Sequence, residues 1–570
     1  MPGIVVAAVV GVLFLLGYRY YSRYIAERVY ALDPNFVTPS HEFEDGVDYV
    51  PTNKHVLFGH HFTSVAGAAP IVGPAIAVFW GWLPALLWVV LGTIFAAGVH
   101  DFGSIVVSVR NRAQNIGTLT SSVINARSRT LFLGIIFFLL TMVNAVFAVV
   151  IAILFEANPG AVIPIFGEIP IAIFIGQYVY RTRTSALGPS LLGVAILYLL
   201  ILVGREVPIE IDGLAESFGI GTRTAWVIIM FVYAAIASRL PVWLLLQPRD
   251  YINSHQLFIA LGVIFLGLLI GMDEIVAPAV RSDIPEGSPN WFPFLFVTIA
   301  CGAISGFHSL VASGTTSKQL DKETDARYVG YMGSVGEGSL AVGSILAATA
   351  GVATLGAWQQ GYVDFPTASA GGIGAFVAGV GAFVSNLGIP ETLGTIFASV
   401  VVISFAATTM DTGVRLQRYI IQEIADVARV RGITKNLNVA TGLAVVIPLI
   451  MALLPGGGEQ GYTFGRLWTL FGTTNQLTAG LALSVIAVWV VSKGRNPTSI
   501  LIPLVFLLAM TSWALFENLQ TFIDNGDWVL APLDAVIFAF ALWLIVEAVG
   551  AFRRASAGVE QPLEEAQRRP

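Results

Sequence analysis

The chain has 570 residues, of which 56% are apolar and only 12% are charged, and its mean hydropathy is +0.77. Soluble domains carry about 25% charged residues, so this composition excludes an ordinary soluble protein. A net charge of −6 without a basic cluster excludes a nucleic-acid-binding surface, and the single cysteine, Cys301, excludes an internal disulfide or a CxxC metal knuckle. The composition predicts an all-α polytopic membrane protein.

Apolar stretches of about 20 residues, long enough to cross a hydrocarbon core as a helix, recur along the chain. The first lacks the basic start and cleavage site of a signal peptide, so we interpret it as a retained helix. A shorter Gly-rich segment, 370–387, is expected to be a re-entrant or surface helix. We predict about 15 transmembrane helices, at 2–20, 62–80, 84–109, 131–154, 165–181, 187–204, 225–246, 256–272, 291–315, 328–355, 389–411, 436–454, 463–491, 499–521 and 528–551.

The distribution of basic residues orients these spans, because short cytoplasmic loops of membrane proteins collect Lys and Arg. An external N-terminus and a cytoplasmic C-terminus place 26 of the 30 Lys and Arg residues inside. Counting 370–387 as a crossing would move the basic residues of 412–435 outside, which favours the re-entrant interpretation. We therefore expect a multi-pass protein of the cytoplasmic membrane. The inside segments are 19–60, 110–130, 181–186, 239–255, 316–327, 412–435, 492–498 and 552–570.

Two apolar runs contain too many helix-breaking or polar residues to be continuous helices. The first, 59–74, holds Pro70 and Pro74 with glycines beside them. The second, 301–316, is dense in Gly, Ser and Thr. The predicted topology makes the two runs cross in opposite directions, and paired interrupted helices of this kind are typical of secondary transporters with inverted repeats. The alternative is that small residues merely allow close helix packing.

A third run, 404–415, carries hydroxyl groups and a carboxylate. Thr408 and Asp411 share a helix face, and together with Thr409 they are candidates for an oxygen site that binds a small cation. The alternative is an i, i+4 ion pair between Asp411 and Arg415.

Histidines lie at both breaks, and a carboxyl group lies at mid-membrane. His60 and His61 are candidates for proton transfer, with a solvated helix cap as the alternative. His308 lies inside the second break, where a packing role is the alternative. Glu337 is deep in its span, where a carboxyl group must be protonated, paired or water-facing, so it is a candidate for ion coupling.

The pair His100 and Asp101 supports a further hypothesis. Adjacent helix residues diverge by about 100°, so each is expected to find a partner on another helix. With His60 and His61, these residues are weak candidates for a transition-metal site, and a metal-dependent intramembrane enzyme is the alternative from another functional class. A passive channel is a second alternative.

Long motifs identify a resemblance at this point: GHHFTSVAGAAPIVGPAIA (59–77), LPALLWVVLGTIFAAGVHDF (83–102), LPVWLLLQPRDY (240–251), PFLFVTIACGAISGFHSLVASGTTSKQL (293–320), ETDARYVGYMG (323–333) and WTLFGTTNQL (468–477). They resemble the carbon starvation protein A family. The resemblance implies a secondary transporter, not an enzyme, that imports short peptides or small carboxylates such as pyruvate during carbon starvation. Coupling to protons is implied, with sodium as the alternative, and no cofactor is required.

The resemblance also implies a LeuT-like core with two discontinuous helices in a five-plus-five inverted repeat. The expected units are 1–60, 61–290 with an inserted helix pair, 291–491, and 492–570 with extra helices and a cytoplasmic tail. Substrate would lie at the half-helix ends, and the expected binding residues are Ser64, Gly67, Ala68, Pro70, Ser305, Gly306, His308 and Ser309. The expected ion-coupling residues are His60, His61, Asp101, Glu337, Thr408, Thr409 and Asp411. The sequence carries no signal for the oligomeric state.

Overall fold

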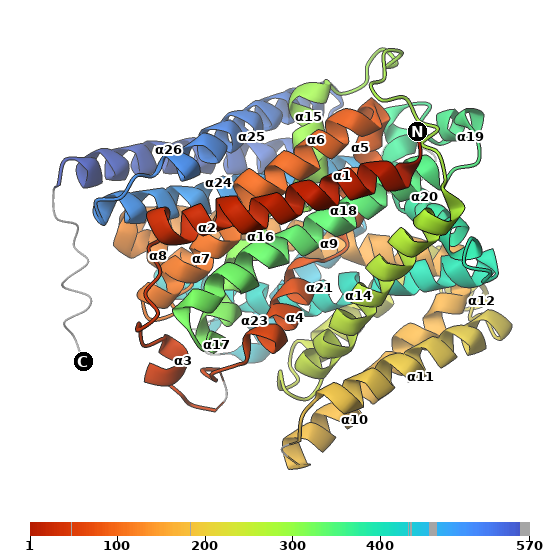
Figure 1. Ribbon diagram of the computed structural model, residues 1–570, viewed down its shortest axis with the longest axis horizontal. Coiled ribbons are helices and arrows are strands. Elements are labelled where there is room, and N and C mark those ends of the chain that lie inside the picture. Colours follow the sequence, from red (N-terminus) through yellow and green to blue (C-terminus); the bar gives the residue numbers. More distant parts are fainter. Residues whose placement is uncertain (47, 183, 431, 434–435, 455–463, 559–570) are drawn as a thin grey trace.

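The computed structural model describes the chain except for residues 47, 183, 431, 434–435, 455–463 and 559–570. Within the described residues the protein is built from helices, and the only strand-like features are two isolated bridges. Figure 1 shows most long helices running roughly along the long axis of the molecule. Of the expected tail 552–570, the part from 559 onward lies outside the described residues.

Twelve helices of the described chain are long and apolar enough to cross a membrane, and fourteen if each of two bent helix pairs counts as one span. Two shorter apolar helices, α13 (Thr222–Ala237) and α23 (Leu437–Ala452), add to these. One of the twelve is the span Trp291–Gln319, and the bent pairs are Lys54–Val65 with Ala69–Trp80, at 51°, and Glu323–Ala350, which ends in α18 (Met332–Ala350), with Leu355–Gly361, at 114°. The other eleven spans are α1 (Gly3–Leu16) continuing through α2 (Ser22–Tyr24), α6 (Trp82–Gly92) continuing into α7 (Gly98–Arg110), α9 (Ala126–Ala157), α10 (Val162–Thr182), α11 (Leu187–Glu206), α14 (Leu246–Gly271), α20 (Phe365–Ser385), α21 (Glu391–Val427), α24 (Phe464–Ser492), α25 (Thr498–Asp524) and α26 (Leu530–Ser556).

Short helices cap the two faces of this bundle or form the broken spans. Those at the faces are α3 (Pro39–Glu42), α8 (Ile116–Val123), α12 (Asp212–Ser217) and α19 (Leu355–Gly361). The broken spans are made of α4 (Lys54–Val65) with α5 (Ala69–Ala77), and of α15 (Trp291–Ile299) with α16 (Gly306–Val311) and α17 (Ser317–Gln319).

The helix α20 begins and ends at the same face of the molecule. At its start, the Phe365 ring lies 5.2 Å from that of Trp80, whose indole N–H donates to the carbonyl of Pro289. Past its end, the Asn386 amide donates to Asp273, 2.7 Å away in the same loop. Although α20 is apolar and long enough to span, it therefore lies across the other helices, as expected for 370–387.

The two described chain ends lie at opposite faces. The amino group of Met1 is 3.6 Å from Glu274, in the loop that α20 also contacts. At the other end, Glu547 of α26 accepts a hydrogen bond from Asn125, the N-cap of α9. This agrees with an odd number of crossings, and each of the fifteen predicted spans has a helical counterpart.

Some predicted boundaries are wrong. The span predicted at 225–246 ends at Ala237, before Leu240-Pro241, because Pro restricts the preceding residue and cannot donate to a continuing helix. The span predicted at 256–272 begins earlier, at Leu246. Residues 246–255, assigned to a cytoplasmic loop from sequence, therefore form nearly three helical turns.

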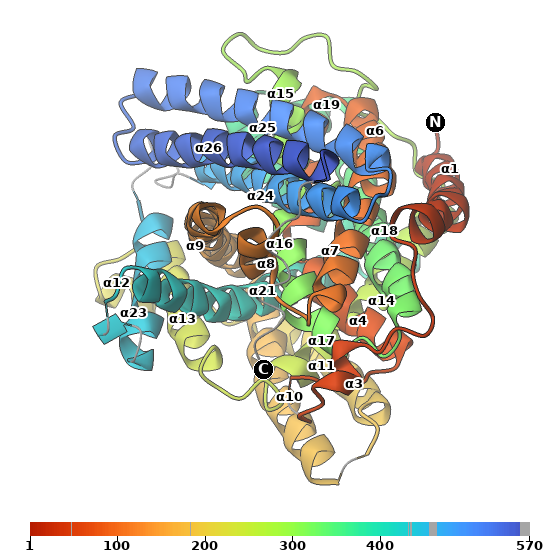
Figure 2. The same ribbon diagram turned by 90° about the vertical axis from the view of Figure 1, so that its left-hand side faces the viewer.

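The centre of the bundle is formed by α9, α21 and α24, whose apolar windows are 89%, 83% and 94% buried. By contrast, the windows of the span that begins with α1 and of α26 are each only 28% buried. Figure 2 shows α1 at one edge of the molecule and α25 and α26 along another. These outer helices present large apolar side chains to the bilayer, whereas the central helices position the site.

Candidate functional site

The first break separates α4 from α5 by Ala66, Gly67 and Ala68, and the two helices are bent by 51°. Pro70 lies in the first turn of α5, a position where its missing N–H costs nothing. Pro74 is inside α5 and removes one further backbone donor. The prolines therefore allow a helix to restart after the break, while Gly67 lies within the break itself.

The second break follows α15 at Ala300, whose φ of 38° lies outside the helical region. A short turn leads to Ser305, an extended residue that forms the N-cap position of α16. Asn475 of α24 stabilises this arrangement: its side chain hydrogen-bonds Ser305 Oγ, and its Oδ1 accepts from the backbone N–H of Phe307 at 3.1 Å. Asn475 is therefore a hydrogen-bonding partner of the break.

The two broken helices cross in opposite directions and touch. The backbone N–H of Thr52, just before α4, donates to the carbonyl of Gln319 at the end of α17. Deeper in the molecule, a Cβ atom at Gly73 would lie only 2.5 Å from the carbonyl oxygen of Thr298. Only glycine at position 73 allows α5 to come this close to the end of α15. The two breaks therefore lie side by side in the bundle.

A narrow cavity lies between the breaks. Gly67 and Ala69 contribute from the first, and Cys301, Ser305 and Phe307 contribute from the second. No lining residue is charged; the remaining lining residues are Val65, Val143, Phe147, Thr409 and Phe471. The hydroxyl of Thr409 is buried without a hydrogen-bond partner in the described chain, which is costly unless a ligand or water supplies one.

Among the residues predicted to bind substrate, Gly67 and Ser305 line this cavity. Ala68 and Pro70 flank the first break, and Gly306 packs so closely on α24 that a Cβ would be 2.4 Å from the carbonyl oxygen of Asn475. Ser309 bonds back to the carbonyl of Gly306, while Ser64 is half-buried on α4 and is not among the lining residues.

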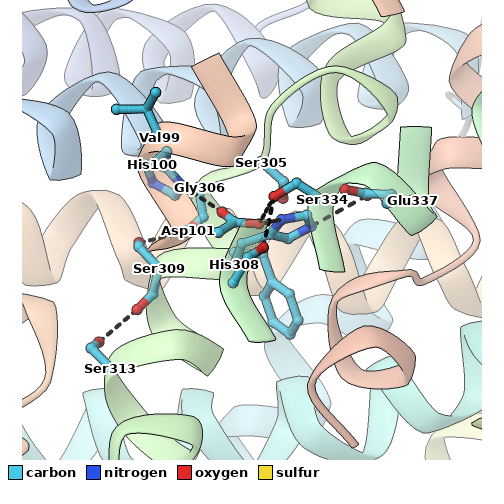
Figure 3. Close-up of polar contacts among 12 residues, drawn as sticks. Val99, His100, Asp101, Ser305, Gly306, His308, Ser309, Ser313, Ser334 and Glu337 are labelled. Atoms are coloured by element: carbon cyan, nitrogen blue, oxygen red, sulfur yellow. Dashed lines mark hydrogen bonds and ion pairs between the residues drawn. The ribbon is translucent and has the colours of Figure 1, made fainter. Parts of the chain in front are cut away.

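One residue beyond the cavity lining, the imidazole of His308 lies between two carboxyl groups (Figure 3). Its Nδ1 is 2.9 Å from Asp101 Oδ2, and its Nε2 is 3.2 Å from Glu337 Oε1. Asp101 is also contacted by His100 Nδ1 at 2.7 Å and by the hydroxyl of Ser334 at 2.7 Å. All five side chains are buried, and we call them the His308 cluster.

Proton placement in the His308 cluster follows from hydrogen-bonding capacity. Asp101 faces three donors, so it is favoured as a carboxylate. If Nδ1 of His308 donates to Asp101, then Nε2 and Glu337 Oε1 would both be acceptors unless one of them carries a proton. Two unprotonated acceptors 3.2 Å apart in a buried site are unfavourable. The contact is therefore a place where one proton can be held and released.

Asp101 finds partners on other helices as expected, in His308 and Ser334, but His100 bonds the adjacent Asp101 instead of a residue on another helix. Rotation of the imidazole about its side-chain bonds brings Nδ1 back to the neighbouring carboxylate, and Asp101 still has room for His308. Nε2 of His100 is buried without a partner in the described chain.

The four candidate metal ligands do not converge. His60 Nδ1 lies 3.5 Å from Asp250, and His61 Nδ1 hydrogen-bonds Thr316. Among the described residues there is no group of three His, Cys, Asp or Glu side chains arranged to hold a metal ion.

A second group of buried charges was largely missed by sequence reasoning. Arg249 Nη1 lies 3.0 Å from Asp411 Oδ2, and its Nε is 3.6 Å from Glu168. Tyr233 donates its hydroxyl to Asp411 at 2.7 Å, and Asp250, next to Arg249 in the sequence, is the third buried carboxyl group. We call these residues, with His60 beside Asp250, the Arg249 cluster; it holds three carboxyl groups and one guanidinium.

The third predicted run belongs to this cluster. Asp411 pairs with Arg249 rather than with Arg415, which donates to the carbonyls of Leu240 and Ala237 instead. Thr408 Oγ1 accepts a hydrogen bond from Asn253. The predicted i, i+4 ion pair is therefore wrong, because a guanidinium from a distant helix reaches the carboxylate.

A signal for Arg249 was present in the motif Gln247-Pro248-Arg249-Asp250. Counting it as a loop cation hid its role, since Pro248 lies in the first turn of α14 and starts that helix. Glu168 was also overlooked, although it is the one acidic residue inside an apolar span at 165–181. An acidic residue inside a span is itself a sign of function.

The chain matches the family model described as carbon starvation protein CstA over residues 2–357 and 364–514. It is 34% identical to the peptide transporter CstA of Mycobacterium tuberculosis (strain ATCC 25618 / H37Rv) over 90% of this chain and 75% of that protein. It is 32% identical to the pyruvate/proton symporter BtsT of Escherichia coli (strain K12) over 92% of this chain and 82% of the relative.

Solved structures of similar shape include a mutant manganese transporter of Eremococcus coleocola, with a TM-score of 0.42 at 13% identity, covering 90% of this chain and 99% of that one. MhsT in complex with L-phenylalanine has a TM-score of 0.44 at 12% identity, covering 87% and 99% of the two chains. The family match spans nearly the whole sequence and includes both breaks and the residues around them. The chain therefore belongs to the carbon starvation protein CstA family.

Proposed function

We propose that this protein is a proton-coupled secondary transporter that imports a small carboxylate such as pyruvate across the cytoplasmic membrane. A single observation carries the proposal: two oppositely directed broken helices meet at a narrow cavity, beside an imidazole held between two carboxyl groups. Two relatives, named a pyruvate/proton symporter and a peptide transporter, support the class of activity. The substrate class is taken from the pyruvate/proton symporter, which is 32% identical over 92% of this chain.

The substrate carboxylate would bind where the half-helices restart. Helix N-termini favour anions, and α5 restarts beside the cavity. Pro70 has no N–H, and the N–H groups of Ile71 and Val72 donate to the carbonyl of Ala68, so the N–H of Ala69 is the first-turn donor that a substrate would use. Ser305 and Thr409 place hydroxyl groups on the same wall. The methyl and keto end of the solute would contact the apolar residues Val143, Phe147 and Phe471.

Coupling to a proton follows from charge. When the proton between His308 and Glu337 is lost, the His308 cluster carries two negative charges, from Asp101 and Glu337. An anion in the cavity is repelled by both, and a proton on the cluster reduces that repulsion. Proton and carboxylate therefore favour each other's binding, which is the thermodynamic requirement for symport.

Several features support a proton rather than sodium as the coupling ion. The oxygen site expected at Thr408 and Asp411 already has nitrogen donors, since Asn253 occupies the hydroxyl and Arg249 the carboxylate. Sodium would have to compete with a guanidinium. His60, which faces Asp250 at 3.5 Å, adds a second group that can carry a proton.

Movement would come from rocking of the expected repeats, 61–290 and 291–491, around the cavity. The orientation proposed from the basic residues has the N-terminus outside and the C-terminus inside. On this basis the face formed by α3, α8 and α17 is cytoplasmic, and the face of α12 and α19 is external.

Uptake into proteoliposomes tests the proposal. An inward proton gradient should drive accumulation of labelled pyruvate above its external concentration, whereas a sodium gradient alone should not. Glu337→Gln should abolish gradient-driven accumulation while retaining exchange of internal for external substrate. Glu517→Gln, on the exposed face of α25, is the matched control and should behave as wild type.

Other outcomes would contradict specific parts of the proposal. Accumulation of di- or tripeptides but not pyruvate would refute the substrate class. Accumulation driven by sodium without a pH gradient would refute the coupling ion. Flux that never exceeds equilibrium under either gradient would refute active transport and support a passive channel.

A further inference from the structure

A groove of about 800 Å³ lies at the edge of the bundle, away from the cavity, and it is lined by the end of the first span together with Arg327. Its lining residues from the first span include Leu15, Arg19 and Arg23. These three residues are spaced by four, as expected for side chains on one face of a helix. The groove therefore changes from apolar to cationic along the direction of the membrane normal.

The charge of the groove is positive. Three guanidinium groups, of Arg19, Arg23 and Arg327, face a single carboxylate, Glu27, which pairs with Arg23 at 2.7 Å. Arg327 is held by neutral partners: it donates to Ser22 Oγ and to the carbonyl of Tyr18, both at 2.8 Å. Among the described residues no carboxylate forms an ion pair with Arg19 or Arg327. With one carboxylate among three guanidinium groups, an anion in the groove would meet a net positive charge.

Tyrosines place the groove at the level of the membrane interface. Tyr18 and Tyr20 line it, and the Arg327 guanidinium lies 4.8 Å from the centre of the Tyr18 ring. Tyrosine is enriched where hydrocarbon meets headgroups. Towards the membrane interior the same helix exposes apolar side chains, with Leu15 67% and Leu16 47% exposed. Nothing in the described protein covers this wall.

We propose that this groove binds an anionic phospholipid of the cytoplasmic leaflet. Its phosphate would lie among Arg19, Arg23 and Arg327, and its acyl chains would lie along the exposed leucines of the first span. A free phosphate would pair with the guanidinium groups but would leave the apolar wall uncovered. The acyl chains of a zwitterionic lipid would pack on the apolar wall, but its headgroup brings a cation into a groove that is already positive.

The location gives the lipid a structural role. Arg327 begins the helical segment that leads into α18, the helix that carries Ser334 and Glu337 of the His308 cluster. Its contacts with Ser22 and Tyr18 are links between that segment and the first span. A phosphate shared by Arg19 and Arg327 adds a further link between the same two elements, so binding is expected to stabilise the folded protein.

The experiment uses the full-length protein purified in a neutral detergent. Phosphatidylglycerol and phosphatidylcholine with identical acyl chains are added separately, and inorganic phosphate forms a third arm. Native mass spectrometry counts the bound lipid, and the thermal unfolding midpoint is followed against lipid concentration. Neither readout depends on transport, so the result is independent of the proposed function.

Phosphatidylglycerol is expected to bind with higher affinity than phosphatidylcholine and to raise the unfolding midpoint. Arg19→Gln should weaken its apparent affinity about fivefold, the effect of about one basic side chain at an anionic surface. Because Arg19 has no ion-pair partner in the described chain, the variant should unfold at the wild-type temperature without lipid. Arg127→Gln, at an exposed arginine in the first turn of α9 and outside the groove lining, is the matched control and should retain affinity.

Three results would overturn the proposal. Equal affinity for the two lipids would show that charge does not select the occupant. An equal loss of lipid affinity in Arg19→Gln and Arg127→Gln would show a diffuse electrostatic effect rather than a site. Stabilisation by inorganic phosphate at the same concentrations would show an anion site without a lipid.

Discussion

The ion pair between Arg249 and Asp411 makes a quantitative prediction, because both side chains are almost fully buried and 3.0 Å apart. At an effective dielectric constant of about 20, two unit charges at this distance attract by about 5 kcal/mol before desolvation is counted. Arg249→Met would leave Asp411 and Glu168 without their shared cation. Breaking a buried pair from one side typically costs about 3–5 kcal/mol, and we expect a loss in that range.

The double variant separates the pair from its surroundings. Asp411→Asn removes the charge that Arg249→Met leaves unpaired, so the two changes together should cost less than their sum by about 2–3 kcal/mol. The measurement is the free energy of unfolding in mixed micelles for wild type, both single variants and the double variant. The double variant should still have a lower free energy of unfolding than wild type, because Glu168 lacks its cation in that variant.

The control is the pair of Arg129 on α9 and Glu423 on α21, which lie 3.2 Å apart and are 36% and 30% exposed. It shares α21 with the Arg249–Asp411 pair, which joins α14 to α21. Solvent screens this pair, so its coupling energy should be about 0.2–1 kcal/mol. If the Arg249 and Asp411 variants are additive within about 0.5 kcal/mol, the two charges do not stabilise each other. The interpretation of the Arg249 cluster as an internally compensated site would then be wrong.

Three further changes test the walls of the cavity and the contact between the breaks. Gly73→Ala should destabilise the protein by about 1–3 kcal/mol because its Cβ would meet the carbonyl of Thr298. Gly374→Ala, in open space on α20, is the control and should be neutral or stabilising. Equal destabilisation by Gly73→Ala and Gly374→Ala would refute the close contact between α5 and the carbonyl of Thr298. Asn475→Ala leaves the buried N–H of Phe307 unpaired, so it should lower the free energy of unfolding by about 1–3 kcal/mol, measured as a lower unfolding midpoint. Thr409→Val removes an unpartnered hydroxyl, so the protein without substrate should be as stable as wild type or more stable. The KM for pyruvate should rise, because the hydroxyl lines the cavity. A loss of both stability and affinity would contradict a role for Thr409 in contacting the substrate.

Local chemistry explains why the breaks were predictable from sequence. Glycine and proline inside an apolar run weaken a helix wherever they occur, and a run dense in hydroxyl groups does not suit a lipid-facing surface. Gly67, Pro70 and Ser305 therefore marked the two sites without any knowledge of their neighbours. That the breaks face each other required the opposite directions of the spans, which the basic loop residues supplied.

Partnerships between distant residues were not predictable in the same way. Asp411 and Arg415 have the spacing of an ion pair, yet Arg249, 162 positions away in the sequence, takes the carboxylate. His100 was expected to find a partner on another helix, yet side-chain rotation lets it bond the adjacent Asp101. Spacing along a helix fixes where Cβ atoms point, but the choice of partner depends on what the neighbouring helices bring.

The adjacent histidines of α4 connect the two buried clusters to one moving part. His60 faces Asp250 of the Arg249 cluster at 3.5 Å, whereas His61 hydrogen-bonds Thr316 at 2.9 Å on the side of the His308 cluster. Neighbouring residues on a helix point about 100° apart, so α4 lies between the two groups: it faces Asp250 on one side and contacts Thr316, in the broken span that carries His308, on the other. Because α4 is the half of the first broken helix that leads to the face of α3 and α17, any opening towards that face that displaces α4 must disturb both contacts. A change of proton occupancy in either cluster can therefore alter the free energy of that opening without a third element to transmit it.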